Sequence, residues 1–315
     1  MRILLIGRGV VATIYGQVWQ EAGHEVEFLV RPGRASGYGP QVRTDLLDAR
    51  RSPLGRRVRT TMPTRLREDL AGDERDLVVL AVAHQSLAAA AADLASRVGR
   101  ATVLVLGNLW DEPAAVLAPL PADQVVLGFP SAGGGFDADG VLHGALLRTV
   151  VLGSAGDRPS PREAALRSLL RQAGFSVRSE PDIRGWLWLH FAQDVGMHAQ
   201  GLRHGGLVGL VGNRPGLRDA MATGAELLPV LQARGVDLRR HRGTVRMLRH
   251  PGPTSVAMAW ATRHVPLAQI SLTAHTDPRA AEPSAVLRDA VREARRLGVA
   301  TPRLDAAVRE LDAAG

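Results

Sequence analysis

The sequence predicts an α/β domain over residues 1–181 and an all-helical domain over residues 182–315. In the first part, short apolar runs alternate with helical stretches, which is typical of a parallel sheet covered by helices. From Asp182 onward the pattern is helical and strand signals are few. A chain of 315 residues is also long enough to form two domains with their own cores.

The first 31 residues predict a strand, a glycine turn, a helix and a second strand. The strand at Ile3 to Ile6 leads into a turn, the helix extends to Ala22, and the second strand covers Val26 to Val30. The turn reads Gly7-Arg8-Gly9-Val10-Val11-Ala12. Its first glycine permits a sharp bend, its second lets a pyrophosphate approach the backbone at the helix N-terminus, and Ala12 packs helix against strand. We therefore expect these six residues to bind a dinucleotide in a Rossmann domain.

Arg31 stands at the tip of the second strand, and Arg34 follows closely. NAD sites usually have an acidic residue at this tip, which bonds the 2′-hydroxyl of the ribose. An arginine suits a 2′-phosphate instead. The expected cofactor is therefore NADP(H).

The remaining elements of the first domain follow in order. Strands are expected at 76–83, 101–106, 124–129, 145–152 and 176–180, with helices at about 86–97 and 111–118 and from 160 to 173. Ser160, Pro161 and Glu163 form a capping box at the start of the last helix. The triple glycine 133–135 is equally well interpreted as a mobile loop near the cofactor or as a plain connection in the sheet.

The second domain is expected to consist of helices only. Its predicted helices cover 182–201, 215–234, about 239–248, about 254–275 with a break at Pro266, 284–297 and 304–313.

Composition excludes several classes of function. There is no cysteine, so disulfides, thiol catalysis and Cys-ligated zinc are ruled out. No apolar run reaches the length of a membrane span. Glycines and charged residues follow the first apolar residues too soon for the apolar region of a signal peptide. We therefore expect a cytoplasmic protein without a membrane partner. The net charge of +8 is the excess of 39 basic residues, all arginine, over 31 acidic residues. They cluster at 50–67 and 239–249 with almost no aromatic residues, which favours solvated faces over a nucleic-acid partner.

Several motifs together resemble the ketopantoate reductase family, a branch of the 6-phosphogluconate-dehydrogenase-like enzymes. The matching segments are GRGVVA at 7–12, Arg31, GN at 107–108, FPSAGG at 129–134, WLHFAQD at 188–194 and the tail from Glu282 through GVATPRLDA. The resemblance implies a Rossmann domain with a helical second domain, binding of NADPH, and reduction of a small 2-keto acid. A homodimer formed through the helical domain is compatible with the sequence.

The chain departs from the family at its catalytic positions. The family's general-acid lysine corresponds to His190, and the asparagine four residues later corresponds to Asp194. A second common lysine is replaced by the segment 83–85, and the chain has no lysine anywhere. Asn108 is retained, where the family contacts both cofactor and substrate. These differences argue against ketopantoate itself as the substrate.

The resemblance also assigns residues toward the C-terminus. Glu282 lies 20 residues before Pro302, which matches the spacing of the family's substrate-organising glutamate, but the aspartate that normally stands two residues after this glutamate is replaced by Ser284. Ser271 and His275 are the nearest candidates for holding a substrate carboxylate, in a stretch that matches the family poorly.

Reduction of a carbonyl requires a proton donor for the developing oxygen charge, and His190 has suitable chemistry. Asp194 lies one turn along the same helix face, where it can bond the imidazole ring, and Glu282 is a second candidate for that task. His190, Asp194 and His198 also fall on one face, but one helix rarely supplies three ligands, so no metal is expected.

Three interpretations of the whole chain follow from these residues. In the first, the chain is an NADPH-dependent reductase of a carbonyl or imine. In the second, it is a scaffold repurposed for non-redox chemistry, and in the third it is a non-catalytic NADP-binding protein. Asn108 and Glu282 favour the first, and the missing lysines favour the other two.

Overall fold

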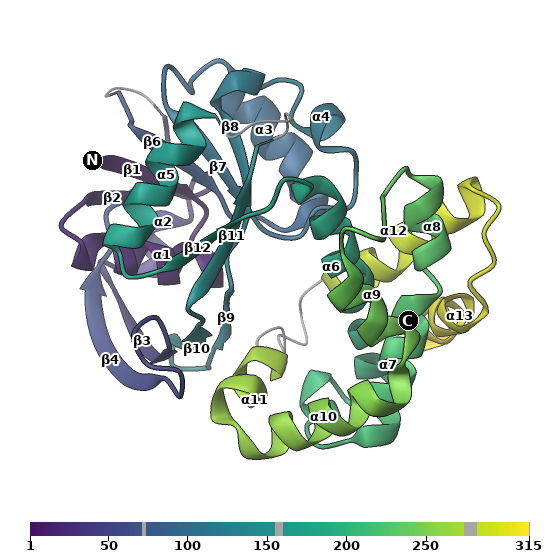
Figure 1. The fold of residues 1–315 in the computed structure, drawn as a ribbon. Coiled ribbons are helices and arrows are strands. Elements are labelled where there is room, and N and C mark those ends of the chain that lie inside the picture. Colours follow the sequence, from purple (N-terminus) through teal and green to yellow (C-terminus); the bar gives the residue numbers. More distant parts are fainter. Residues whose placement is uncertain (71–73, 155–159, 274–281, 315) are drawn as a thin grey trace. The chain divides into compact units, whose positions relative to one another are not determined.

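The computed structural model describes residues 1–70, 74–154, 160–273 and 282–314 (Figure 1). The chain divides into two units. One comprises Met1–Gly107 and Asp111–Ile183, and the other comprises Asn108–Trp110 and Arg184–Gly315. The first is α/β and the second is helical, which confirms the predicted fold class. None of the described helices combines the length and apolar character needed to cross a membrane.

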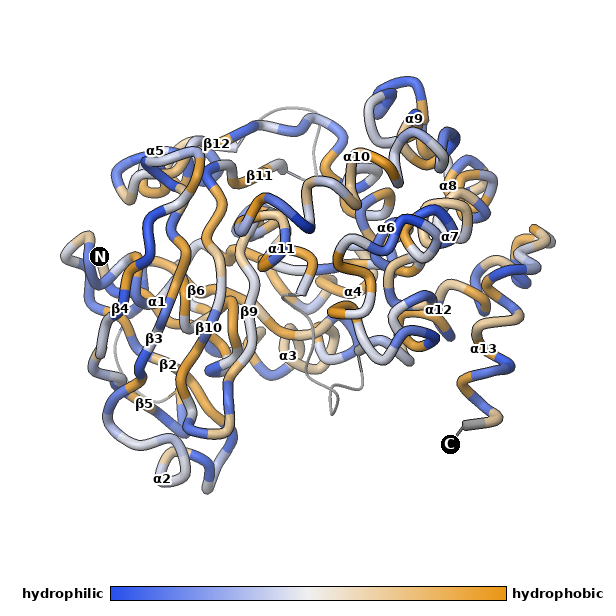
Figure 2. Tube along the Cα trace, turned by 90° about the horizontal axis from the view of Figure 1, so that it is seen from below, coloured by the Kyte–Doolittle hydropathy of each residue, from blue (hydrophilic) through white to orange (hydrophobic). Residues whose placement is uncertain are grey.

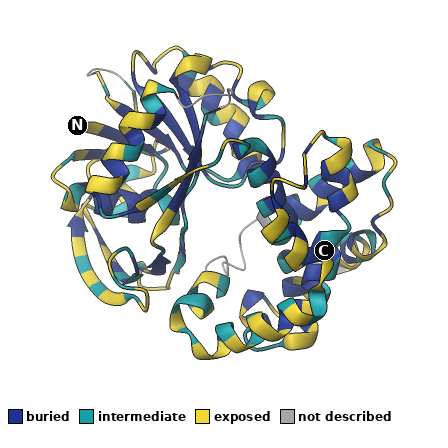
Figure 3. Ribbon diagram, viewed as in Figure 1, coloured by how far each residue is buried: buried dark blue, intermediate teal, exposed yellow. Residues whose placement is uncertain are grey.

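An eight-stranded sheet forms the centre of the first unit, in the order β12-β11-β8-β7-β6-β1-β2-β5. Its strands are β1 (Arg2–Ile6), β2 (Glu25–Leu29), β5 (Leu66–Arg67), β6 (Leu77–Leu80), β7 (Thr102–Leu106), β8 (Val125–Phe129), β11 (Thr149–Gly153) and β12 (Ser176–Ser179). Neighbouring strands are parallel except that β11 runs antiparallel to β8. The middle strands of this sheet are hydrophobic and buried, as β6 is throughout (Figures 2 and 3). Burial on both faces explains why these strands are continuous apolar runs in the sequence.

The prediction of one strand over 145–152 was wrong. The chain forms β10 (Val141–Leu146), turns at Leu147 and Arg148, and then forms β11. Arg148 is exposed, and the Leu147 amide donates to the Ser131 carbonyl (2.9 Å). The apolar run therefore belongs to two strands in two different sheets, and the exposed arginine marks the turn between them.

A second, four-stranded sheet was not predicted. Its order is β4-β3-β10-β9, with β3 at Gln41–Asp48, β4 at Arg56–Pro63 and β9 at Ala132–Phe136. The triple glycine is thus part of β9 rather than a loop. A Cβ atom on Gly134 would collide with the His143 carbonyl of the paired strand β10, so glycine allows the close approach of these two strands.

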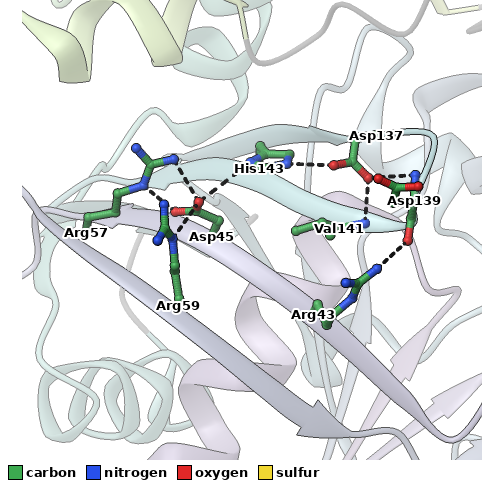
Figure 4. A network of polar contacts seen from close by, with 8 residues as sticks. All are labelled: Arg43, Asp45, Arg57, Arg59, Asp137, Asp139, Val141 and His143. Carbon is green, nitrogen blue, oxygen red and sulfur yellow. Dashed lines mark hydrogen bonds and ion pairs between the residues drawn. The ribbon is translucent and has the colours of Figure 1, made fainter.

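The outward face of this second sheet carries a network of paired charges (Figure 4). The Asp45 carboxylate accepts hydrogen bonds from Arg57 (Nε to Oδ1, 2.6 Å) and from Arg59 (Nε to Oδ2, 3.1 Å). The bond from Arg57 is the main reason that the pKa of Asp45 is lowered to about 2. His143 bonds Asp137 at 2.8 Å. These arginines of the 50–67 cluster are therefore compensated by the chain's own carboxylates.

The core of the first unit forms around helix α1 (Val10–Glu21), which packs against both sheets. Tyr15 and Trp19 are fully buried, and Tyr15 also stacks on Phe175 with ring centroids 5.5 Å apart. The Tyr15 hydroxyl donates to the Pro130 carbonyl (2.5 Å), just after β8. Helices α2 (Ala35–Tyr38), α3 (Leu87–Ala95), α4 (Pro113–Val116) and α5 (Pro161–Gln172) complete the unit. The predicted cap of α5 is confirmed, since the Ser160 side chain accepts from the Glu163 amide (3.1 Å).

The described part of the second unit is built from helices. They are α6 (Ile183–Arg203), α7 (Arg214–Ala225), α8 (Leu228–Ala233), α9 (Arg242–Arg249), α10 (Pro251–His264), α11 (Pro266–Thr273), α12 (Glu282–Arg296) and α13 (Pro302–Ala314). The predicted break at Pro266 is confirmed. The single helix expected over 215–234 was wrong, because Pro229 lies in the first turn of α8, where its missing N–H costs no hydrogen bond, so the chain starts a new helix there.

Helices α6 and α7 approach each other closely through small residues. A Cβ atom on Gly196 would collide with the Ala220 carbonyl, and one on Gly224 would lie 2.7 Å from the Ala192 carbonyl. All four residues are buried. The close approach holds the middle of α6 in a fixed position against α7.

We predict that Gly196→Ala lowers the free energy of unfolding by about 2–3 kcal/mol, because the added methyl group forces the two backbones apart. The control is Gly252→Ala in α10, where a Cβ atom meets nothing within 4 Å. That substitution is expected to be neutral or slightly stabilising. Chemical unfolding of both variants tests the prediction, and equal stabilities would contradict it.

Candidate functional site

The glycine turn between β1 and α1 has the geometry that the sequence predicts. Gly7 adopts φ +85°, a conformation that favours glycine, and its amide donates to the Leu29 carbonyl of β2 (2.7 Å). Gly9 caps α1 without a side chain, the first turn of α1 has no acidic residue, and Ala12 is fully buried. Cβ atoms placed on Gly7 and Gly9 would meet nothing within 4 Å. The positive end of α1 therefore faces open space, as a pyrophosphate site requires.

Arg8 lies in this turn close to two aromatic rings, a contact that was not predicted from the sequence. Its guanidinium carbon is 4.9 Å from the ring centroid of Tyr38 and 5.8 Å from that of Phe136. Burial lowers the pKa of Arg8, and its buried Nε atom has no hydrogen-bond partner among the described residues. A cation with an unused donor beside the open glycine turn is a fitting group for a phosphate.

Arg31 and Arg34 follow β2 as two exposed residues of one turn, in which the Arg34 amide donates to the Arg31 carbonyl (3.1 Å). Neither side chain forms an ion pair with any residue in the described ranges. Glu68 supports the turn, since its carboxylate accepts from the Ala35 amide (2.8 Å). Bonds from the Ala35 and Gly33 amides lower the pKa of Glu68. The two guanidinium groups thus stand on a supported turn and are available to an anion.

Three predicted site residues, Asn108, Asp194 and His190, lie close together in the second unit, although 86 positions separate Asn108 from Asp194. Asn108 Nδ2 donates to Asp194 Oδ2 (2.8 Å), and the other carboxylate oxygen, Oδ1, lies 3.7 Å from His190 Nε2. The His190 and Asp194 side chains are about a quarter and a fifth exposed (27% and 20%). Asp194 therefore joins the histidine and the asparagine into one polar cluster that remains accessible to solvent.

The orientation of the Asn108 amide follows from this contact. A carboxylate can only accept, so the amide nitrogen faces Asp194 and the amide oxygen faces the other way. That oxygen is buried and has no hydrogen-bond partner among the described residues. Since buried acceptors are normally satisfied, Asn108 Oδ1 is suited to receive a donor from a bound molecule.

Aromatic residues hold the cluster in place. Trp186 stacks on the His190 ring, with centroids 5.4 Å apart and planes inclined by 10°. Two residues after Asn108, Trp110 stacks on Phe191 of α6 at 4.7 Å. Arg234 donates to the Trp110 carbonyl (2.6 Å) and lies 3.5 Å from the Trp188 ring centroid. The segment 108–110 is thereby fixed to α6, the helix that carries His190 and Asp194.

The other predicted residues are not part of this cluster in the described structure. Ser271 is an exposed residue of α11. Glu282 begins α12, and its side chain lies outside the described residues, as does the whole of His275. His198 is buried. Among the residues that the structure describes, no group of three or more histidine, aspartate and glutamate side chains could hold a metal ion.

Two contacts of the site were missed by sequence reasoning. The stacking of Trp186 on His190 is an i, i+4 pair on one helix and could have been found from spacing alone. The pairing of Arg8 with Tyr38 and Phe136 could not, because Phe136 belongs to the second sheet, which no apolar pattern revealed.

A mostly parallel sheet whose first strand and helix meet at an open glycine turn defines a Rossmann-type domain, joined here to a helical unit. Residues 3–157 match the family model of ketopantoate reductase PanE/ApbA. Over these residues, which are just under half of its length, the chain matches the ketopantoate reductase family. A search of curated proteins found no match.

Solved structures share the fold over the full length of the chain. The 2-dehydropantoate 2-reductase from Geobacter metallireducens is similar with a TM-score of 0.72 and 19% identity, covering 100% of both chains. A ternary structure of D-mandelate dehydrogenase with NADH and anilino(oxo)acetate has a TM-score of 0.68 and 17% identity, covering 99% of this chain and 98% of that one. The dimeric ketopantoate reductase from Staphylococcus aureus has a TM-score of 0.65 and 15% identity, covering 99% and 100%.

Proposed function

We propose that the protein is an NADPH-dependent reductase that converts a carbonyl group of a small organic substrate, other than ketopantoate, to an alcohol. The family match over residues 3–157 supports an oxidoreductase on CH–OH groups. The observation that carries the proposal is the Asn108–Asp194–His190 cluster, because it assembles a titratable donor at the position where the family has a lysine.

The residues of the glycine turn fit the cofactor. Gly7, Gly9 and the N-terminus of α1 leave open space for a pyrophosphate, and the unused Nε donor of Arg8 is available to it. Val10, Val11 and Ala12 form the first turn of α1 and provide its backbone amides and its packing on the sheet. Arg31 would hold a 2′-phosphate, with Arg34 as a second cation. When bound, the reduced nicotinamide supplies a hydride to the carbonyl carbon.

The chain's own residues would manage the proton. His190, in its imidazolium form, donates a proton to the carbonyl oxygen as negative charge develops there. Asp194 lies 3.7 Å from the ring, close enough to stabilise its positive charge, and it is itself oriented by the hydrogen bond from Asn108. The free Oδ1 acceptor of Asn108 would position a donor group of the substrate or the cofactor.

The family has lysines at two positions of its site, and this chain has no lysine at all. For this reason the proposed substrate is not ketopantoate. D-mandelate dehydrogenase, which shares the fold, acts on a 2-hydroxy acid with an aromatic group. Trp186 provides an aromatic surface next to His190. Bulky 2-oxo acids are therefore the first class to test, and Ser271, His275 and Glu282 remain candidates for contacts with the substrate.

The test has two stages on the full-length protein. Titration with NADPH is expected to give saturable binding, and NADPH oxidation is then followed with a panel of aliphatic and aromatic 2-oxo acids that includes 2-dehydropantoate. We expect turnover with at least one bulky 2-oxo acid and little with 2-dehydropantoate. Binding without any turnover would instead identify a non-catalytic or repurposed NADP-binding protein. Absence of binding would reject the cofactor assignment.

A further inference from the structure

We infer that the helical unit carries an anion-binding pocket for a small molecule with at least two phosphate groups. The pocket has a volume of about 400 Å³ and is lined by residues between 232 and 250, none of which belongs to the candidate active site. The sequence had suggested only a solvated basic face here. This inference does not depend on the proposed reductase activity.

Four arginines line the pocket, namely Arg239, Arg242, Arg246 and Arg249. None of their side chains forms an ion pair with a residue in the described part of the chain. The only acidic lining residue is Asp237, whose carboxylate accepts from the Arg239 backbone amide (3.0 Å) and lies 3.9 Å from Arg240. The arginines of the second sheet, in contrast, are paired with Asp45. The pocket therefore has a clear excess of positive charge.

Helix α9 carries three of these four charges on one face. Val245 and Leu248 are its buried residues, and Arg242, Arg246 and Arg249 share an adjacent exposed face at spacings of four and three residues. The arginines of the last turn are favoured by the helix dipole. Arg242 is in the first turn, where the dipole disfavours a cation and no acidic residue compensates it. Helix stability therefore does not account for Arg242, whereas a bound anion does.

The pocket's chemistry indicates the class of ligand. Guanidinium groups match phosphate oxygens in geometry and charge, and four of them exceed what a single monovalent anion would need. Val236, Leu238 and Val245 give the pocket a buried apolar floor on which an organic portion of the ligand can rest. The lining contains no phenylalanine, tyrosine or tryptophan, so it lacks the large aromatic surfaces on which the bases of single-stranded nucleic acids stack.

Calorimetric titration of the full-length protein with tripolyphosphate tests the inference. We expect one site per chain, at least about tenfold tighter than for inorganic phosphate and weakened by added salt. The double variant Arg242→Gln/Arg246→Gln should lose about ten- to hundredfold in affinity. The matched control, Arg214→Gln/Arg218→Gln, removes the same charge from exposed residues outside the pocket and should lose less than about threefold.

Two further measurements separate this pocket from other anion sites. Arg31→Gln should leave tripolyphosphate binding unchanged, because Arg31 belongs to the other unit. A single-stranded oligonucleotide should bind more weakly than tripolyphosphate. Equal losses in the pocket and control variants, loss of binding in Arg31→Gln, or tighter binding of the oligonucleotide would each overturn the inference.

Discussion

Replacing His190 by alanine is expected to lower kcat by about 10²–10⁴-fold with the carbonyl substrate that the protein accepts, while the Kd for NADPH stays unchanged. The reason is that His190 is the titratable donor of the Asn108–Asp194–His190 cluster, whereas the glycine turn and its arginines belong to the other unit. Steady-state kinetics and NADPH titration measure the two quantities separately.

Two further variants make this test specific. His264→Ala removes an exposed histidine of the same unit and should leave kcat unchanged. Asp194→Asn keeps an acceptor for Asn108 but removes the charge next to the ring, so we expect a smaller loss of about tenfold. A His190→Ala enzyme with normal turnover would show that the proton comes from another group or from water.

The second large effect concerns the choice of cofactor. The double variant Arg31→Gln/Arg34→Gln is expected to weaken NADPH binding by about a hundredfold, on the order of 2.8 kcal/mol, and to leave NADH binding nearly unchanged. Both side chains are exposed and make no ion pair with the described residues, so their removal should not disturb the fold. The difference in Kd between the two nucleotides reports directly on the 2′-phosphate.

The control for this prediction is Arg97→Gln/Arg100→Gln. It removes two exposed arginines from the same unit and leaves the loop after β2 intact. If the control weakens NADPH binding equally, the effect reflects net charge only. If Arg31→Gln/Arg34→Gln weakens NADH and NADPH alike, these arginines do not recognise the 2′-phosphate.

The sequence predicted most of the main sheet because its strands are continuous apolar runs or end at recognisable glycines. It did not predict the second sheet. In β3 and β4, apolar residues alternate with arginine, aspartate and threonine, and the two strands acquire their stability from pairing rather than from apolar content. Arg56 to Arg59 therefore looked like a surface charge cluster, although they are part of a strand that pairs with β3.

The candidate active site was predictable where one helix carries it. Spacing placed His190 and Asp194 on one face, and the structure places Asp194 Oδ1 3.7 Å from the ring. The hydrogen bond to Asn108 could not be derived from spacing, because it joins two residues that are 86 positions apart in the sequence. The free donor of Arg8 and the free acceptor of Asn108 also became visible only when burial and hydrogen bonding could be assessed atom by atom.

The short segment 108–110 has a consequence for how this molecule can be divided. It is covalently continuous with the sheet domain, but it packs with the helices, so the chain passes between the units three times rather than once. A fragment that starts after residue 183 would lack Trp110, which belongs to the helical core, and Asn108, which orients Asp194. The two units are therefore not interchangeable modules: a chimera that keeps this helical unit must also carry its three-residue insert.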